Sequence, residues 1–152
     1  MEKRHELSLL CRVGELLCAL PLEHVEETMR PLPVAAIAGV PSFVRGLAVL
    51  RGAPVPVVDT ASLLTGHASH PGRFVTVKTG NRRVALIVDT VVGVVEIPGD
   101  SIDALPRLLQ DARLDAISAA GAVDADLLLV LRSSRLVSEE AWALLDPDCA
   151  LA

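Results

Sequence analysis

The stretch GLAVLRGAPVPVVDTASLL, residues 46–64, decides the fold of this chain. Two runs rich in Val and Leu flank an Arg-Gly pair at residues 51–52, and this pattern predicts a β-hairpin. Because proline has no backbone N–H to donate, Pro54 and Pro56 predict that the second strand lies at a sheet edge or carries a bulge. The stretch therefore indicates a β-rich fold built from hairpins.

Arg51 places a positive charge at the turn of this apolar hairpin. If the guanidinium is buried it needs a carboxylate partner, because an unpaired buried charge is costly. Glu26 and Glu27 precede the hairpin and are the candidate partners, since a planar guanidinium can bind a carboxylate through two contacts. An exposed turn arginine is the alternative, and composition does not decide between the two.

Asp59 and Asp89 each end an apolar run and are each followed by Thr. An aspartate in this position can accept hydrogen bonds from the backbone amides of the turn or helix that follows it. We favour this structural role over a binding role for both residues.

Residues 22–30 show helical spacing. Leu22, Val25 and Met29 fall on one side of a helix, and the segment ends before Pro31, where a helix is expected to stop. We therefore predict a short helix here.

The rest of the chain alternates strand-like runs with turn residues. A short helical turn is expected after Asp59, and Ser138 is the expected N-cap of a closing helix. The predicted elements are a hairpin of 6–13 and 15–22 around Gly14, a meander of 73–80, 82–91 and 92–98 with a turn at 80–81, a hairpin of 116–123 and 126–132 around Asp124, and a helix at 137–145.

Residues 53–60 and 83–90 resemble each other, since each has a turn, an apolar run and then Asp-Thr. Two similar small β lobes in one chain would produce this repeat, and hairpins over this length would then form two five-stranded barrels. The alternative is that any two Val-rich strands look alike.

Composition excludes several classes of function. The chain is 51% hydrophobic with only 2% aromatic residues and a formal charge of −5, which disfavours both stacking on single-stranded nucleic acid and binding to duplexes. Cys11, Cys18 and Cys149 lack the close spacing of a zinc site. The first apolar run is too short for a signal peptide and no run reaches the length of a membrane span, so we expect a cytoplasmic protein.

Enzymatic chemistry has little support in the sequence. His67 and His70 lie three residues apart in a loop and could ligate a metal, but no further ligand accompanies them at useful spacing. A triad of Cys18, His24 and Asp59 is conceivable, yet there is no nucleophile elbow and no phosphate-binding loop. We therefore expect no enzyme, metal or cofactor, and keep a small metal-dependent β-barrel enzyme as the outlying alternative.

Residues 17–66 strongly resemble a CheW-like domain, the coupling module of bacterial chemotaxis. Residues 82–98 look like the second-lobe strands of that family, and residues 138–146 look like its closing helix. The family pattern P-x-F-V-x-G-φ-x-x-L-R-G-x-φ-φ-P-φ-φ-D-φ is matched by Pro41, Phe43, Gly46, Leu50, Arg51, Gly52, Pro56 and Asp59.

The resemblance implies a mainly β fold. It would contain two five-stranded SH3-like barrels that share a core, with short helices including one at the C-terminus. Residues 1–152 would form a single CheW-like domain, with second-lobe strands at about 73–132.

The resemblance also implies a non-enzymatic adaptor that links transmembrane chemoreceptors to the histidine kinase CheA. The helical hairpin tip of the receptor would lie in an apolar groove between the lobes. The CheA regulatory domain, itself CheW-like, would pack barrel to barrel. No nucleic acid and no membrane insertion are expected, and self-association through exposed barrel edges stays open. An adaptor of another receptor–kinase pathway is the alternative.

Site residues follow from the matched positions. Val25 looks like a receptor-groove position, and Glu27 and Arg51 look like paired charges that shape the groove. Two positions depart from the family, which often has Asn at position 49 and commonly has Asp at position 132. The interface candidates are Val25, Glu27, Leu47, Val49, Arg51, Val88 and Thr90, and the structural candidates are Gly46, Gly52, Pro56, Asp59 and Asp89.

Overall fold

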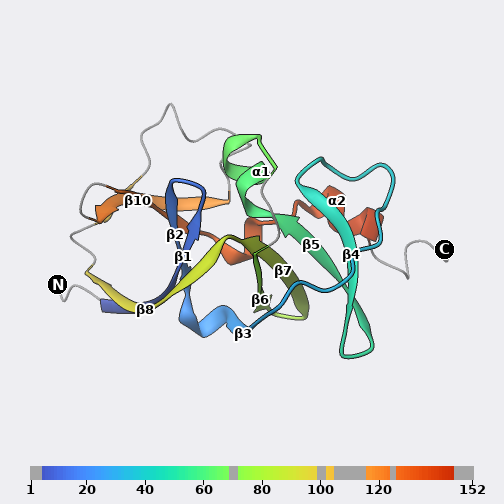
Figure 1. The fold of residues 1–152 in the computed structure, drawn as a ribbon, viewed down its shortest axis with the longest axis horizontal. Coiled ribbons are helices and arrows are strands. Elements are labelled where there is room, and N and C mark those ends of the chain that lie inside the picture. The colour runs from blue at the N-terminus through green and yellow to red at the C-terminus, as the bar shows by residue number, and fades with distance from the viewer. Residues whose placement is uncertain (1–4, 69–71, 99–101, 105–115, 124–125, 146–152) are drawn as a thin grey trace.

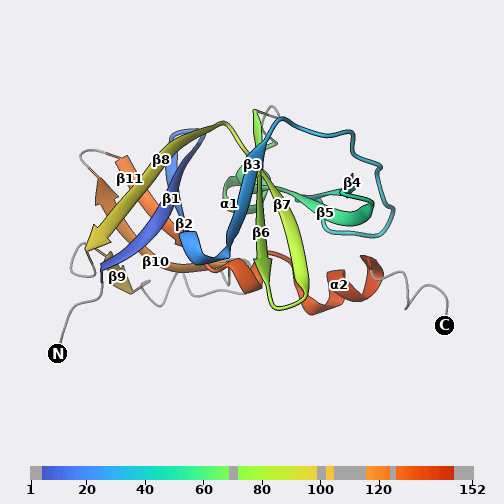
Figure 2. The same ribbon diagram turned by 90° about the horizontal axis from the view of Figure 1, so that it is seen from below.

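The computed structural model of the chain describes residues 5–68, 72–98, 102–104, 116–123 and 126–145 (Figure 1). Within them the fold is mainly β, as predicted, and consists of two sheets with short helices. Figure 2 shows the two sheets as lobes that lie side by side, with β8, β1 and β11 in one lobe and β3, β7 and β4 in the other.

One lobe contains a six-stranded sheet in the order β8-β1-β2-β11-β10-β9. Its neighbouring strands pair antiparallel, except that β2 and β11 run parallel. The hairpin predicted around Gly14 and the last predicted hairpin are confirmed, although Asp124 lies outside the described residues. The strands are β1 (His5–Val13), β2 (Leu16–Pro21), β8 (Thr90–Pro98), β9 (Ile102–Ala104), β10 (Ile117–Val123) and β11 (Asp126–Leu131).

The other lobe contains a five-stranded sheet in the order β3-β6-β7-β5-β4, in which β5 and β7 run parallel. The predicted hairpin around residues 51–52 is confirmed as β4–β5, and that around residues 80–81 as β6–β7. The strands are β3 (Val25–Met29), β4 (Val44–Leu50), β5 (Ala53–Asp59), β6 (Arg73–Thr79) and β7 (Arg82–Val88).

The two lobes divide the chain differently from the prediction. Residues 73–132 do not supply one lobe, because β6 and β7 belong to the five-stranded sheet. The third strand of the predicted meander, β8, pairs with β1 instead, since β7 already has β6 and β5 on its two edges. The short β9 gives the other sheet six strands where five were predicted.

The repeated segments also have a different explanation. Residues 53–60 and 83–90 contain β5 and β7, which lie side by side in one sheet rather than in two lobes. Val57 pairs with Ala85 and Asp59 pairs with Ile87 in the parallel register. The likeness therefore reflects two adjacent buried parallel strands, which require similar apolar side chains.

Residues 22–30 do not form the predicted helix. A 3₁₀ turn, η1 (Leu22–His24), is followed by β3, along which Val25, Glu27 and Met29 are half-buried while the residues between them are exposed. Prolines limit the segment to nine residues, and so short a helix is marginal. Pairing with β6 satisfies the β3 backbone instead.

The prolines of β5 occupy the one part of the strand that has a single neighbour. The prediction of an edge strand is wrong, because β5 lies between β7 and β4. Pairing with β7 begins only at Val57, however, so Pro54 and Pro56 face β4 alone. The bulge lies in β4 between Val44 and Gly46, not in β5.

Two α-helices and a second 3₁₀ turn complete the described elements: α1 (Thr60–Thr65), α2 (Glu139–Leu145) and η5 (Ser133–Arg135). Both α-helices were predicted. Ser138 caps α2 as expected, because its Oγ accepts a hydrogen bond from the Ala141 N–H at 3.1 Å.

The lobes share a core, as the family resemblance implied. Each sheet also has its own small apolar cluster, around Leu10 and Leu128 in one and around Phe74 and Val57 in the other. Burial of the common cluster removes a large apolar area from water and holds the two sheets together. Its members include Leu9, Cys11, Leu20, Val58, Val75, Leu86, Leu129, Leu136 and Ala141.

Candidate functional site

An ion pair joins Arg51 to Glu27, as predicted. Nη2 of Arg51 donates to Oε2 of Glu27 at 3.0 Å and lies 3.0 Å from Oε1. Arg51 stands in the β4–β5 turn with a left-handed φ of 51°, and Glu27 lies on β3. β3 and β4 are the two edge strands of the five-stranded sheet, so the pair bridges its opposite edges.

The other candidate partner of Arg51, Glu26, binds Arg83 of β7 instead. Both Nε and Nη2 of Arg83 donate to this carboxylate, the second at 3.1 Å. These hydrogen bonds hold the pKa of Glu26 below its ordinary value and raise the pKa of Arg83. Adjacent glutamates on β3 therefore fix the strand at two places, because each has its own arginine.

Asp59 is fully buried and caps α1, as predicted, since its Oδ1 accepts from the Ser62 N–H at 3.3 Å. Its Oδ2 accepts from Nη2 and Nε of Arg45 at 2.7 and 3.2 Å. Sequence reasoning missed this arginine. Two features of the sequence could have indicated it. Asp59 ends an apolar run, where a buried carboxylate would require a cation, and Arg45 stands near the start of the strand that pairs with this run.

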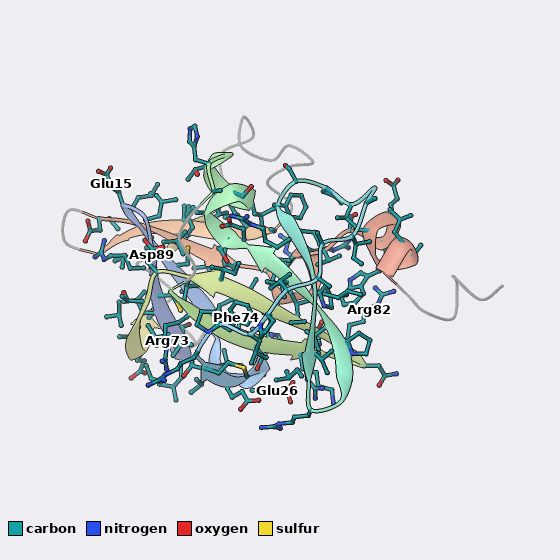
Figure 3. The ribbon with its side chains drawn as sticks, turned by 45° about the vertical axis from the view of Figure 1, so that its right-hand side comes forward. Glu15, Glu26, Arg73, Phe74, Arg82 and Asp89 are labelled. Atoms are coloured by element: carbon teal, nitrogen blue, oxygen red, sulfur yellow. The ribbon has the colours of Figure 1, made fainter. Side chains whose placement is uncertain are left out.

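Asp89 has a different partner from the predicted one. Its Oδ2 accepts from the Gly14 N–H at 2.8 Å, and its backbone N–H donates to the Arg12 carbonyl at 2.9 Å. Asp89 thus ties the end of β7 to the β1–β2 hairpin across the two lobes, rather than capping the next turn (Figure 3). The chain distance of 75 residues between donor and acceptor explains why local sequence could not predict the contact.

The β4 edge carries two of the interface candidates. Val49 is 69% exposed, whereas Leu47 is half-buried against the common core. The Leu47 backbone pairs with Ala35 through hydrogen bonds of 2.8 and 2.9 Å. Gly46 permits this approach, because a Cβ on it would lie 1.9 Å from the Ala35 carbonyl oxygen. Pairing covers part of the edge and leaves Val49 on the surface.

The remaining interface and structural candidates differ in how far their side chains are exposed to solvent. Val25 is half-buried and packs against the common core, and Thr90 is exposed at the start of β8. Val88 is only 1% exposed, so its side chain has no access to a partner and we withdraw it as a contact residue. Gly52 adopts a φ of 80° in the hairpin turn, and Pro56 is buried opposite Leu47.

An exposed apolar surface on β1 and β8 was not found from the sequence. Leu7, Val92 and Val94 are each more than half exposed. Val94 pairs directly with Leu9, a member of the common core, so the surface continues outward from the junction of the lobes. Figure 1 shows β8, β1 and β3 along the same lower side of the molecule. Residues 91–95 show no alternation of apolar and polar side chains, so an exposed face of this strand could not be predicted from the sequence.

We call Leu7, Val25, Val92 and Val94 the junction surface. Contiguous exposed apolar side chains on a folded protein are typical of contacts with a partner. The half-buried Val25 follows η1, which contacts β1, and so belongs to the same region.

Catalytic groups do not assemble among the described residues. Burial raises the pKa of the Cys11 and Cys18 thiols to about 12, so neither is a ready nucleophile. Asp59 contacts Arg45 and α1, as described above, so its known contacts are structural. His67 is exposed and His70 lies outside the described residues. Across the described ranges no three His, Cys, Asp or Glu side chains come together as metal ligands.

No helix within the described part of the chain is both long enough and apolar enough to cross a membrane.

The chain belongs to the CheW-like domain family, whose pattern matches residues 8–141. Chemotaxis protein CheW of Klebsiella aerogenes is 28% identical over 116 residues, which cover 74% of this chain and 70% of that protein. Protein FrzA of Myxococcus xanthus is 32% identical over 101 residues, covering 64% of this chain and 63% of FrzA.

The fold has a solved counterpart in the crystal structure of the scaffolding protein TtCheW from Thermoanaerobacter tengcongensis. The TM-score is 0.71 at 23% identity, and the match covers 85% of this chain and 90% of that chain. Family membership identifies this protein as a scaffold or adaptor of the chemotaxis type and not an enzyme.

Proposed function

We propose that this protein couples the cytoplasmic tips of chemoreceptors to the regulatory domain of the histidine kinase CheA, in the cytoplasm beside membrane receptor arrays. The family assignment supports an adaptor of this kind. The observation that carries the receptor half of the proposal is the junction surface, where apolar side chains emerge from the core between two lobes. An amphipathic helix docks on such a surface through rows of apolar residues.

The Glu27–Arg51 pair shapes this surface in our proposal. Glu27 lies two residues after Val25 on β3, and its pairing with Arg51 fixes the position of this edge strand. Arg51 is 69% exposed and Glu27 31% exposed, so the pair contributes at most about 1 kcal/mol to stability. Its role is therefore to position β3 rather than to stabilise the fold.

The kinase half of the proposal requires a second surface, because an adaptor must hold both partners at once. Leu47, Val49 and Thr90 are the proposed contact residues outside the junction surface. Val49 lies on the edge strand β4, and exposed edges are suitable for contact with another β domain.

Titration calorimetry with matched surface variants tests the receptor half. We expect a receptor-tip fragment to bind with micromolar affinity, about −8 kcal/mol. Val94→Lys should weaken this binding at least tenfold, and Leu144→Lys on α2 is the matched control, since the two side chains are 53% and 57% exposed. Equal affinities of the two variants for the receptor fragment would contradict the assignment of the junction surface.

The second candidate function is the same kind of adaptor in a different receptor–kinase pathway. The match to protein FrzA, whose name is not that of a chemotaxis protein, favours keeping this candidate. Parallel titrations with the regulatory domains of each CheA-type kinase from the source organism would separate the two, because only the cognate kinase should bind with micromolar affinity.

A further inference from the structure

A second feature of the molecule lies away from the junction surface. A cavity of about 430 Å³ opens between the β6–β7 hairpin, η5 and α2. Figure 2 shows α2 on the opposite side of the molecule from β8. The polar and aromatic side chains that line the cavity include Thr79, Arg82, Ser134, Arg135, Glu139 and Trp142.

The guanidinium of Arg82 is held in a defined orientation. Its Nη1 and Nη2 donate to the two oxygens of Glu139 at 2.5 and 2.9 Å. The ring of Trp142 lies against the guanidinium, 5.0 Å from ring centroid to Cζ, an arrangement that favours a cation over the aromatic face. Figure 3 shows Arg82 beside α2. The wall of this cavity therefore presents a planar cation with a fixed direction.

Two arginines act on the carboxylate that already lies in the cavity. Hydrogen bonds from Arg82 and the nearby charge of Arg135 hold the pKa of Glu139 below its ordinary value. A second carboxylate or a phosphate in the place of Glu139 would meet the same two cations.

The cavity already accommodates a carboxylate. Glu139 is 74% exposed, so its pairing with Arg82 is open to solvent and easily exchanged. Thr79 and Ser134, whose side chains carry hydroxyl groups, also line the cavity. An arginine fork matches two oxygens of a carboxylate or phosphate equally well.

We propose that this cavity is an oxyanion-binding site, which takes a carboxylate or a phosphate group between Arg82 and Arg135 in exchange for the side chain of Glu139. The inference does not depend on the proposed receptor and kinase partners, since it rests on a separate surface. It also gives the basic segment at residues 132–135 a role that the adaptor function leaves open.

Trp142 provides a direct test, because it is the only tryptophan and the chain has no tyrosine. The intact protein is titrated with inorganic phosphate and, separately, with glutarate, at constant ionic strength maintained with KCl. Intrinsic fluorescence and the indole N–H resonance of Trp142 are both followed. We expect a saturable change with at least one anion, and the more effective anion identifies the natural chemistry as phosphate or carboxylate.

Three variants make the test specific. Arg135→Gln should weaken anion binding about tenfold, because it removes a charge-assisted contact. Glu139→Gln should strengthen binding several-fold, since the competing carboxylate is gone. Arg30→Gln removes the same charge from an exposed position after β3 and should leave the affinity unchanged within about twofold. Circular dichroism establishes that each variant is folded.

The proposal is overturned if neither Trp142 signal saturates with either anion. It is also overturned if Arg135→Gln and Arg30→Gln bind the anion equally well, because the effect would then be general ionic screening. Receptor and kinase binding are absent from this experiment, so its failure would leave the proposed adaptor function intact.

Discussion

Replacing Arg45 with Ala should destabilise the protein far more than its position on the surface suggests. The Arg45 side chain is 40% exposed, but it pairs with Asp59, whose side chain is fully buried. Removing the cation leaves a buried carboxylate that keeps its hydrogen bond from Ser62 and loses two from the guanidinium. Breaking a fully buried pair costs about 3–5 kcal/mol. The partial exposure of Arg45 lowers our expectation to about 2–3 kcal/mol.

Urea unfolding measures this cost through the shift of the midpoint at constant slope. For a chain of this length the corresponding loss in Tm is roughly 4–12 °C. Arg30→Ala is the control and should change the free energy of unfolding by less than about 0.5 kcal/mol.

A double-mutant cycle isolates the ion pair itself. Asp59→Asn keeps an oxygen that can cap α1 but removes the charge, so Arg45→Ala should cost at least about 1 kcal/mol less in that background. The proposed cost of breaking the Arg45–Asp59 pair is wrong if Arg45→Ala is as stable as Arg30→Ala, or if Arg45→Ala costs the same with Asp and with Asn at position 59.

Three further predictions concern single sites. Gly46→Ala should cost about 3 kcal/mol or more in urea unfolding, because the new Cβ would meet the Ala35 carbonyl and the backbone φ is 141°. The pKa of Glu26 is lowered from 4.5 by its hydrogen bonds to Arg83. The ionised carboxylate therefore contributes to stability above pH 4.5, and this contribution is lost as the pH falls through the lowered pKa. Glu26→Gln should flatten the pH dependence of the urea midpoint between pH 6 and 3. Cys11 and Cys18, with thiol pKa values of about 12, should react with a thiol reagent only when the protein unfolds.

Each of these predictions has its own control. Gly14→Ala tests the clash at Gly46, since Gly14 also has a positive φ but has open space at its Cβ and should cost less. Glu23→Gln, on an exposed side chain, should leave the pH dependence almost as steep as in the unmodified protein. A Cys149→Ser background removes the third thiol from the labelling experiment. Rapid labelling of this background under native conditions would contradict the burial of the two strand cysteines.

The sequence predicted the hairpins well because each depends on neighbouring residues. Gly14 and Gly52 both adopt positive φ in their turns, and Asp59 caps α1 within three residues of itself. Such local signals identify strands and caps without knowledge of the rest of the fold. The family resemblance added the arrangement of two lobes around a common core.

The sequence failed where a segment has two acceptable local structures. Val25 and Met29 fit helical spacing, but Val25, Glu27 and Met29 also alternate as a strand does. Tertiary pairing with β6 decided between the two. Helical spacing over nine residues is too weak a signal to override such pairing.

Long-range pairing was the other limit. The parallel contacts of β5 with β7 and of β2 with β11 join strands that are distant in the sequence, and hydrophobic pattern alone does not specify them. A family pattern was available for Glu27 and Arg51, and this pair was predicted correctly. No such pattern was available for the contacts of Arg45 with Asp59 and of Gly14 with Asp89, and both were missed.

Sedimentation of a three-component mixture tests whether this protein holds a receptor and a kinase at the same time. The protein is combined with the CheA regulatory domain and a receptor-tip fragment from the same source, each at several times the micromolar dissociation constants expected. We expect one ternary complex that contains all three components. Arg51→Ala should bind the receptor fragment up to about fivefold more weakly, the limit set by an ion pair worth about 1 kcal/mol, and should keep the kinase domain. A mixture in which the two partners displace each other, or in which neither binds, would contradict a coupling function.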